Sequence, residues 1–220
     1  MDNTIYIAFM GCGWRFPFLF GVAKFIEEHT QTNHVKYVGV SGGAVVAYSL
    51  LAKVVDITYK NALSKIAECP YAPFGMCDFI ERVAHECFHE YPKNDSLTLV
   101  ATNISSRSTE YFTAFESKDD LCKCMRASSH IPLLGGSIFY KHRGTHFVDG
   151  EMSVTIEAIK RKFGKCIIVD FCENADIKPT ISIPRWWSYF PQNESIMEYM
   201  FNHGYERAKA YFQSHHRWSP

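Results

Sequence analysis

Ser41, which lies between glycines, is the side chain of this 220-residue chain best suited to chemistry. The stretch Gly39-Val40-Ser41-Gly42-Gly43 fits G-x-S-x-G, the pattern of a serine nucleophile on a sharp turn from a strand into a helix. Gly39 and Gly43 let such a turn close without a Cβ clash, and the helix amino terminus favours developing negative charge. The same residues also suit a plain turn with a capping serine, so the choice depends on the partners of Ser41.

A glycine loop, Gly11-Cys12-Gly13-Trp14-Arg15, follows the first predicted strand, residues 4–10. In a parallel sheet this loop leaves from the same edge as Ser41, so its backbone N–H groups are candidates to hold the oxyanion of an attacked carbonyl. Gly-x-Gly after a first strand is also half of a dinucleotide-binding motif. Phe16 at the third glycine position, and Ser41 where an acidic residue would hold a ribose, argue against that alternative.

The base that would activate Ser41 lies elsewhere in the chain. Asp149-Gly150 follows a predicted strand, residues 146–148, and precedes a helix, so we expect Asp149 at the carboxyl edge of the sheet as well; a plain Asp-Gly turn is the alternative. The α/β-hydrolase order is a poor match, because Ser41 follows only the second strand. The other candidates are histidines in polar or boundary stretches, where packing histidines are common: His130, His142 and His146.

The alternation of strand and helix patterns predicts an α/β fold, a three-layer sandwich whose mostly parallel central sheet carries helices on both faces. Strands are predicted at 4–10, 34–40, 97–104, 110–115, 137–140, 146–148 and 166–171. Helices are predicted at 17–28, 44–52, 55–68, 76–90, 117–127, 154–163 and 194–214. No linker-like stretch divides the chain, which favours one domain over residues 1–220.

The composition argues against several classes of function. Lys plus Arg equals Asp plus Glu at 23 each, so no overall charge favours nucleic acid, and no nucleic-acid partner is expected. Residues 1–10 have no basic n-region and predict a strand rather than a signal peptide. Apolar runs fall short of the roughly 20 residues of a membrane span. A cytoplasmic protein is therefore expected.

The cysteines predict neither disulfides nor a metal site. They are scattered through a chain with no recognisable secretory signal, which favours reduced structural thiols. Cys122-x-Cys124 has no second pair at zinc-ligand spacing, so no metal ligands are predicted. The eight positions are Cys12, Cys69, Cys77, Cys87, Cys122, Cys124, Cys166 and Cys172.

Four stretches together resemble the patatin-like phospholipase family. In chain order they are Gly11-Cys12-Gly13, Gly39-Val40-Ser41-Gly42-Gly43, Ala127-Ser128-Ser129-His130-Ile131-Pro132 and Val148-Asp149-Gly150. The Gly-Cys-Gly form is similar to the adipose-triglyceride-lipase and adiponutrin branch of the family. The resemblance covers about residues 4–171, and four landmarks in order are far more specific than one.

The resemblance implies a Ser-Asp dyad without histidine. Ser41 would attack an ester carbonyl and Asp149 would take its proton. The implied supporting residues are the oxyanion-holding backbone of Gly11, Cys12, Gly13 and Trp14, the motif glycines Gly39, Gly43 and Gly150, and a buttress at residues 127–132. Members of the family cleave acyl groups from phospholipids or neutral glycerolipids, with no cofactor and generally without calcium. A lipid ester is therefore the implied substrate.

Departures from the family pattern leave alternatives open. Glu151 stands where glycine or alanine is usual, Phe16 stands where glycine is usual, and Cys12 replaces a glycine. A carboxylate beside Asp149 either raises the pKa of Asp149 or is simply solvated. The retained Ser41 and Asp149 favour a serine lipid acyl hydrolase; a catalytically weak member that binds lipid or a protein partner is the second interpretation, and an acyltransferase is the third.

An aromatic segment, Pro184-Arg185-Trp186-Trp187-Ser188-Tyr189-Phe190-Pro191, places four rings and a base between prolines. This composition suits a membrane interface or the rim of an acyl-chain pocket, so peripheral membrane contact through Trp186 and Trp187 is one hypothesis. A loop packed on the core is the other.

Overall fold

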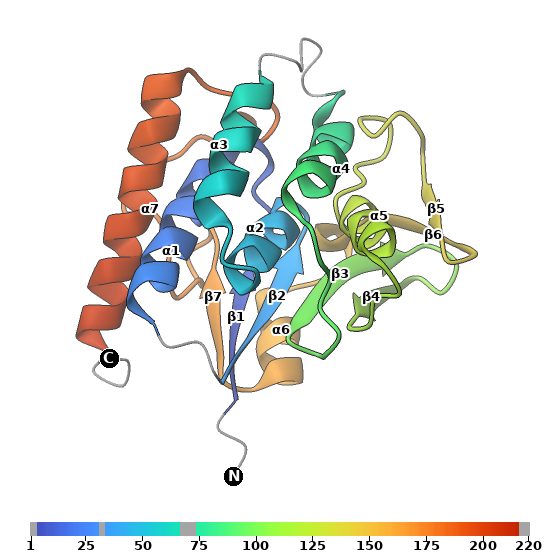
Figure 1. Ribbon diagram of the computed structural model, residues 1–220, viewed down its shortest axis with the longest axis horizontal. Helices are drawn as coiled ribbons and strands as arrows, with labels where there is room; N and C mark the ends of the chain where they lie inside the picture. Colours follow the sequence, from blue (N-terminus) through green and yellow to red (C-terminus); the bar gives the residue numbers. More distant parts are fainter. Residues whose placement is uncertain (1–3, 31–33, 67–73, 216–220) are drawn as a thin grey trace.

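A seven-stranded sheet runs through the described part of the chain, residues 4–30, 34–66 and 74–215 of a computed structural model. Its strands are β1 (Ile5–Phe9), β2 (Val35–Val40), β3 (Leu97–Asn103), β4 (Ser108–Phe112), β5 (Tyr140–His142), β6 (Thr145–Asp149) and β7 (Cys166–Val169). Strands β3, β2, β1 and β7 are neighbours in that order and run parallel (Figure 1). The pairs β3–β4, β3–β6 and β5–β6 are antiparallel.

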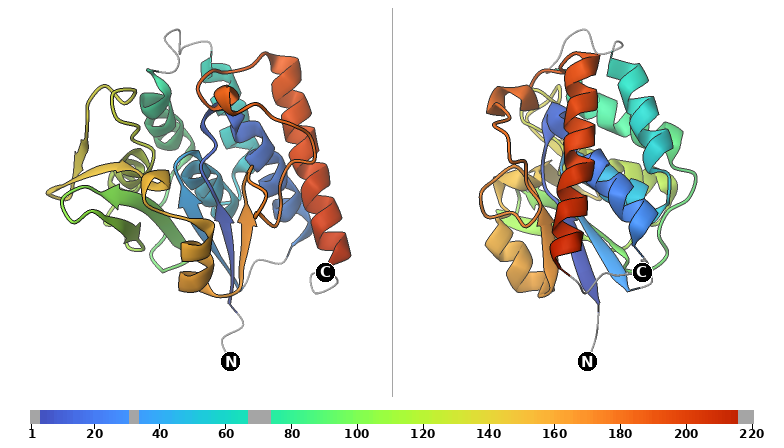
Figure 2. Two further views of the ribbon diagram at one scale, coloured as in Figure 1. Left: turned by 180° about the vertical axis from the view of Figure 1, so that it is seen from behind. Right: turned by 90° about the vertical axis from the view of Figure 1, so that its left-hand side faces the viewer.

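Helices cover the two faces of the sheet unequally (Figures 1 and 2). Side chains of β1 alternate between the faces: Ile7 and Phe9 join the larger core, and Ala8, with Met10 just after the strand, joins the smaller one. The larger core lies under α1 (Phe16–His29), α2 (Gly42–Leu51), α3 (Val55–Ile66), α4 (Met76–Cys87), α5 (Lys118–Ser128) and α7 (Glu194–Ser214), and the smaller core under α6 (Ile156–Phe163). The predicted α/β class, with a mostly parallel sheet and helices on both faces, is confirmed.

One edge of β3 carries two strands end to end. Strand β4 pairs with residues 99–103 of β3, so it occupies one edge; β2 pairs with residues 97–100 and β6 with residues 101–103, so these two share the other edge. Val40 is opposite Val100 and Asp149 is opposite Ala101. The carboxyl ends of β2 and β6 therefore meet head on. Asp149 reaches the expected edge of the sheet, but on an antiparallel strand that enters from beyond that edge.

The predicted element bounds fail mainly between α5 and β6. The strand predicted at 137–140 is wrong, because β5 begins at Tyr140 and the Leu133 N–H donates to the Ser137 carbonyl in a turn before it. The strand predicted at 110–115 lies at Ser108–Phe112. The helix predicted at 76–90 ends at Cys87, since Phe88 is extended, and residues 67 and 68 of the helix predicted at 55–68 lie outside the described residues.

Helices α1 and α7 lie side by side (Figure 1), and glycines let their backbones meet. A Cβ atom on Gly21 would lie 1.9 Å from the Phe201 carbonyl oxygen, and one on Gly204 would lie 2.0 Å from the Phe18 carbonyl oxygen. Neither distance is possible for a real Cβ atom, so this packing requires glycine at both positions.

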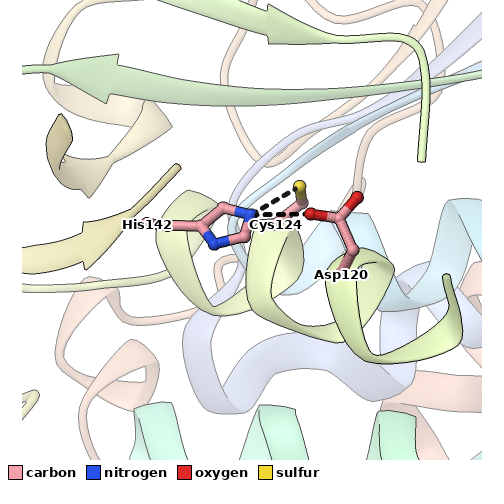
Figure 3. Close-up of side chains that lie close together, drawn as sticks. All are labelled: Asp120, Cys124 and His142. Carbon is pink, nitrogen blue, oxygen red and sulfur yellow. Dashed lines mark hydrogen bonds and ion pairs between the residues drawn. The ribbon is translucent and has the colours of Figure 1, made fainter. Parts of the chain in front are cut away.

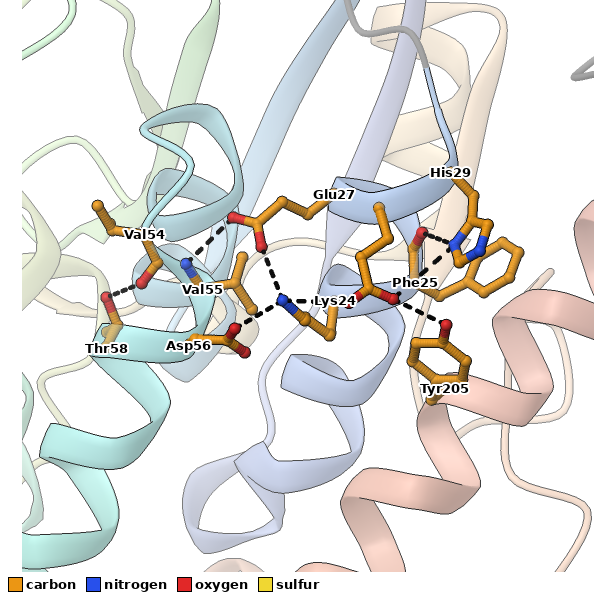
Figure 4. Close-up of polar contacts among 10 residues, drawn as sticks. Lys24, Phe25, Glu27, His29, Val54, Val55, Asp56, Thr58 and Tyr205 are labelled. Atoms are coloured by element: carbon orange, nitrogen blue, oxygen red, sulfur yellow. Dashed lines mark hydrogen bonds and ion pairs between the residues drawn. The ribbon is translucent and has the colours of Figure 1, made fainter. Parts of the chain in front are cut away.

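Polar contacts at the surface join α1 to its neighbours (Figure 4). Lys24 Nζ lies 2.6 Å from Asp56 Oδ2 of α3 and 3.2 Å from Glu28 Oε1. The Tyr205 hydroxyl of α7 donates to Glu28 Oε2 at 2.8 Å. Because exposed ion pairs are typically worth less than about 1 kcal/mol, buried packing contributes more than this network to the position of α7.

None of the described helices is long and apolar enough to cross a membrane. The seven cysteines in the described part of the chain are free thiols, and Cys69 lies outside it.

We expect Gly204→Ala to lower the free energy of unfolding by about 1–3 kcal/mol, because the new methyl group can fit only if α7 moves away from α1. Urea unfolding measures the change. Asn202→Ala is the matched control, since Asn202 is exposed on the same helix, and it should change stability by less than about 0.5 kcal/mol. Equal behaviour of the two variants would contradict close packing of α7 on α1.

Candidate active site

Ser41 occupies a strained turn between β2 and α2. Its backbone has φ +54° and ψ −131°, a left-handed conformation that non-glycine residues rarely adopt. The neighbouring glycines are sterically required: a Cβ atom on Gly39 would lie 2.4 Å from Ala44 Cα, and one on Gly43 would lie 2.2 Å from the Phe9 carbonyl oxygen. The turn thus holds the Ser41 side chain at the end of the strand, at the amino terminus of α2.

Ser41 and Asp149 are in direct contact. The Ser41 hydroxyl donates to Asp149 Oδ2 at 2.6 Å. Both residues are buried: 6% of the surface of Ser41 and 5% of that of Asp149 are exposed. The other carboxylate oxygen, Oδ1, accepts the Glu151 N–H at 2.9 Å, where Asp149 caps the short helix η2 (Gly150–Met152). One oxygen is therefore fixed by backbone and the other faces the serine.

The end of α5 and the residues that follow it, within the stretch 127–132, contact both Ser41 and Asp149. Ser128 Oγ accepts the Ser41 N–H at 2.9 Å and donates to the Val100 carbonyl at 2.6 Å. The His130 carbonyl accepts the Asp149 N–H at 2.8 Å. Gly150 leaves room for this arrangement, since a Cβ atom there would lie 2.3 Å from the Val100 oxygen.

Burial gives Asp149 an unusual proton affinity. It raises the pKa of the carboxyl group from 3.8 to about 6, although the hydrogen bonds from Ser41 and from the Glu151 N–H act in the opposite direction. Asp149 is therefore largely ionised at neutral pH, yet it is a stronger base than an exposed aspartate. Such a group is better suited to accept a serine proton.

A pocket of about 520 Å³ opens beside the pair. Of the predicted oxyanion residues, Gly11, Cys12 and Gly13 line it, whereas the Trp14 side chain is buried behind them and packs on Phe79. The remaining lining residues are Arg15, Ser41, Met76, Ile131, Asp149, Glu151, Met152, Asp170, Phe171, Cys172, Ile183, Arg185, Ser188 and Tyr189. No histidine is among these described residues.

Cys12 has a packing role at the start of α2. A Cβ atom on Gly42 would lie 2.6 Å from Cys12 Sγ, so the thiol packs where that glycine has no side chain. Burial raises the pKa of the Cys12 thiol well above its ordinary value, so it is a poor nucleophile.

The Glu151 side chain is the main feature of the pocket that sequence reasoning missed. The prediction considered only its effect on Asp149, but the carboxylate lies against the glycine loop, where it accepts a hydrogen bond from the Gly11 N–H. Glu151 as a residue is exposed, but its carboxylate end packs against the glycine loop; desolvation there, and then the charges of Asp149 and Asp170, raise its pKa to about 7. The one signal in the sequence is that Glu151 replaces a small residue of the family pattern.

Two of the three histidines considered as bases have partners elsewhere. His130 Nε2 lies 3.2 Å from the Ser137 carbonyl, and His142 Nε2 lies 3.1 Å from Asp120 Oδ1. Burial lowers the pKa of both rings. None of the three lines the pocket beside Ser41.

Asp120, Cys124 and His142 form a cluster between α5 and β5 whose potential ligand atoms lie within 4.8 Å of one another (Figure 3). The donor types would suit zinc. However, Arg143 bonds both oxygens of Asp120, with Nε 3.1 Å from Oδ1 and Nη2 2.5 Å from Oδ2. The guanidinium already supplies the positive charge that a cation would bring, so the cluster fits a structural role better than a metal site.

The aromatic segment lies beside the glycine loop. Its short helix η3 (Arg185–Ser188) brings the Ser188 carbonyl oxygen to 2.1 Å from where a Gly13 Cβ atom would be. Trp187 packs on the core, whereas Trp186 is 57% exposed. The two tryptophans of the membrane hypothesis therefore differ: only the Trp186 ring is largely exposed.

The fold resembles that of a solved structure, the crystal structure of VipD from Legionella pneumophila, with a TM-score of 0.50 and 10% identity over 97% of this chain and 67% of that one. This likeness concerns the fold alone. No family model matches the chain.

Related sequences are more specific. The chain is 26% identical over 227 residues to patatin-like phospholipase domain-containing protein 2 of Homo sapiens, covering 96% of this chain and 44% of that protein. It is 27% identical over 192 residues to patatin-like phospholipase domain-containing protein 4, also of Homo sapiens, covering 80% of this chain and 75% of that protein. The chain thus spans less than half the length of the first relative. Its resemblance to patatin-like phospholipase domain-containing proteins is confirmed.

We expect Asp149→Asn to stabilise the protein, and more so at pH 8 than at pH 5. A folded pKa raised above the unfolded value means that the folded state binds more protons, so the wild type loses stability as pH rises from about 4 to about 6. The full shift corresponds to about 3 kcal/mol, and asparagine does not titrate. Urea unfolding at both pH values measures it; a variant that is no more stable than the wild type at pH 8 would contradict the burial argument.

Proposed function

We propose that this protein is a serine lipid acyl hydrolase that cleaves carboxylic esters of phospholipids or glycerolipids. The observation that carries the proposal is the 2.6 Å hydrogen bond from Ser41 Oγ to the buried Asp149 carboxylate, at the wall of a 520 Å³ pocket. The resemblance to patatin-like phospholipase domain-containing proteins supports it independently.

The geometry suits a two-step reaction. Ser41 Oγ attacks the ester carbonyl while Asp149 Oδ2 takes the hydroxyl proton, and N–H groups of the glycine loop, with the amino terminus of α2, stabilise the oxyanion. Collapse of this intermediate breaks the ester bond, and the leaving alkoxide receives the proton from Asp149. Water then attacks the acyl-serine, Asp149 takes its proton, and Ser41 leaves with that proton as the acid is released.

The exposed apolar side chains support a lipid substrate. In the described part of the chain, six of the ten large exposed hydrophobic residues line the pocket or lie within two residues of a lining position. They are Phe74, Leu133, Met152, Trp186, Tyr189 and Phe190. Apolar residues gathered around the entrance of a site suit contact with a lipid surface.

A lipid-binding protein of low catalytic activity is the second candidate. The contact between the Glu151 carboxylate and Gly11 favours it, because this side chain lies where the oxyanion would need a free N–H group.

An acyltransferase is the remaining interpretation. Product analysis with a competing alcohol acceptor separates hydrolysis from acyl transfer.

Ser41→Ala and Asp149→Asn should each reduce hydrolysis of a panel of phospholipids and acylglycerols by about 10³-fold or more, because the first removes the nucleophile and the second removes the base that takes its proton. Ser49→Ala is the matched control: Ser49 lies on α2, the helix that begins just after Ser41, and its hydroxyl donates to the Val45 carbonyl. It should keep most of the wild-type rate. Retention of activity by Ser41→Ala would exclude Ser41 as the nucleophile.

Trp186→Ser should weaken sedimentation with phosphatidylcholine liposomes by about tenfold, since burying one large apolar side chain contributes at least about 1.5 kcal/mol. Hydrolysis of a soluble short-chain ester should not change. Ile57→Ser removes an equally exposed apolar side chain far from the pocket residues in the sequence and serves as the control. If both variants bind liposomes like the wild type, Trp186 makes no membrane contact.

A further inference from the structure

The end of the Glu151 side chain lies against Gly11, in a place it would have to leave if position 11 carried a side chain. A Cβ atom on Gly11 would lie 2.2 Å from Glu151 Cδ and 2.5 and 2.6 Å from its two oxygens. The Gly11 N–H hydrogen bonds to this carboxylate. Glu151 and Gly11 both line the pocket that holds Ser41 and Asp149. The carboxylate thus lies against the glycine loop, whose N–H groups are the proposed oxyanion donors.

The backbone of Glu151 is tied to the catalytic pair. Its N–H donates to Asp149 Oδ1 at 2.9 Å, so the side chain starts from the same short helix η2 that Asp149 caps. Ser41 and Glu151 line the same pocket.

Charged groups from several elements face the Glu151 carboxylate. The negative ones are Asp149 at the end of β6 and Asp170 after β7, and the positive one is Arg15 of the short helix η1 (Gly13–Arg15). The Cys12 thiol of the glycine loop and Arg185 of η3 also line the pocket. Burial and the two aspartates outweigh Arg15 and the Gly11 N–H, so the carboxylate changes its charge near neutral pH.

We propose that the ionised Glu151 side chain is a built-in competitor of the substrate oxyanion for the Gly11 N–H, and that the protein is active when this carboxyl group is protonated or displaced. The inference rests on the proposed function and adds a regulation of the same site. Ionised, the carboxylate holds the Gly11 N–H and repels a second anion. Protonated, it binds the N–H more weakly and gives way to the charged intermediate.

The proposal predicts a narrow pH range for activity. Asp149 has to be ionised to take a proton, so activity rises as pH increases through its pKa of about 6. Glu151 has to be neutral, so activity falls as pH increases through its pKa of about 7. The wild type should therefore be most active between these values, and a variant without a carboxyl group at position 151 should keep only the rising limb.

The test compares wild type, Glu151→Ala and Glu151→Gln by labelling Ser41 with a fluorophosphonate and by hydrolysis of a soluble ester, from pH 5 to pH 9. In labelling, Ser41 Oγ bonds to phosphorus, fluoride leaves, and Asp149 takes the hydroxyl proton. At pH 8 about one wild-type molecule in eleven has a neutral Glu151, so Glu151→Ala should react about tenfold faster than wild type. At pH 6 most wild-type molecules have a neutral Glu151, so the two rates should agree within about twofold. Glu151→Gln keeps the shape without the charge and should also lose the falling limb.

Asp170→Asn is the matched control, because it removes one negative charge from the same pocket. Without Asp170 the pKa of Glu151 falls, so this variant should label more slowly than wild type at pH 7, the opposite of Glu151→Ala. If both variants label faster, loss of charge in the pocket is the cause and the Gly11 contact is not.

The possible failures are distinguishable. Ser41-dependent labelling of the wild type, with an unchanged pH profile or a slower rate in both Glu151 variants, overturns the proposal and leaves the proposed function standing. Absence of Ser41-dependent labelling and hydrolysis in the wild type and in both Glu151 variants overturns the two together.

Discussion

The edge of β3 that β2 and β6 share is the constraint on which the candidate site depends. Because β2 ends opposite Val100 and β6 ends opposite Ala101, two strands that are far apart in the chain stop one residue apart along the same backbone. Ser41 follows one end and Asp149 forms the other. Their hydrogen bond is therefore set by sheet register, which side-chain flexibility cannot easily change. Ser128, whose hydroxyl bonds both Val100 and the Ser41 N–H, adds a second link to the same point of β3.

This arrangement places an unfavourable charge and a strained backbone in one location. Asp149 is buried, and Ser41 has a positive φ. Both features cost stability, and both suit the proposed chemistry: burial makes the carboxylate more basic, and the turn places Ser41 at the pocket wall. Two packed cores, one on each face of the sheet, supply the stability that keeps these features in place. Such local conflict within an otherwise consistent fold is typical of functional sites.

Residue patterns predicted most of this fold and the two central residues. Strand and helix periodicity located the elements of both cores, and the glycines around Ser41 marked a turn whose close contacts with Ala44 and Phe9 exclude any side chain. Periodicity carries no information on strand direction, so the antiparallel entry of β6 was not predictable. The short strand β5 was misplaced for a similar reason. Its three residues are too few to show a periodic pattern, and the apolar residues of the turn before it resemble a strand pattern. The contact of Glu151 with Gly11 depends on tertiary packing between η2 and the glycine loop, which no local pattern encodes.

The chemistry of the pocket depends on two neighbouring carboxyl groups. Burial raises the pKa of Asp149 to about 6. Glu151 is exposed as a residue, but its carboxylate end packs against the glycine loop, where desolvation and the Asp149 charge raise its pKa to about 7. A drier pocket would give a more basic Asp149, but it would also keep Asp149 protonated to higher pH. In a wetter pocket Glu151 would ionise more readily, and its carboxylate would bind the Gly11 N–H more strongly. In the proposed mechanism, a small residue at position 151 would remove the competition for the Gly11 N–H and leave Ser41 and Asp149 in place. The proposed contribution of the glutamate is therefore to set the pH range in which the site reacts, because Ser41 and Asp149 alone supply the nucleophile and the base.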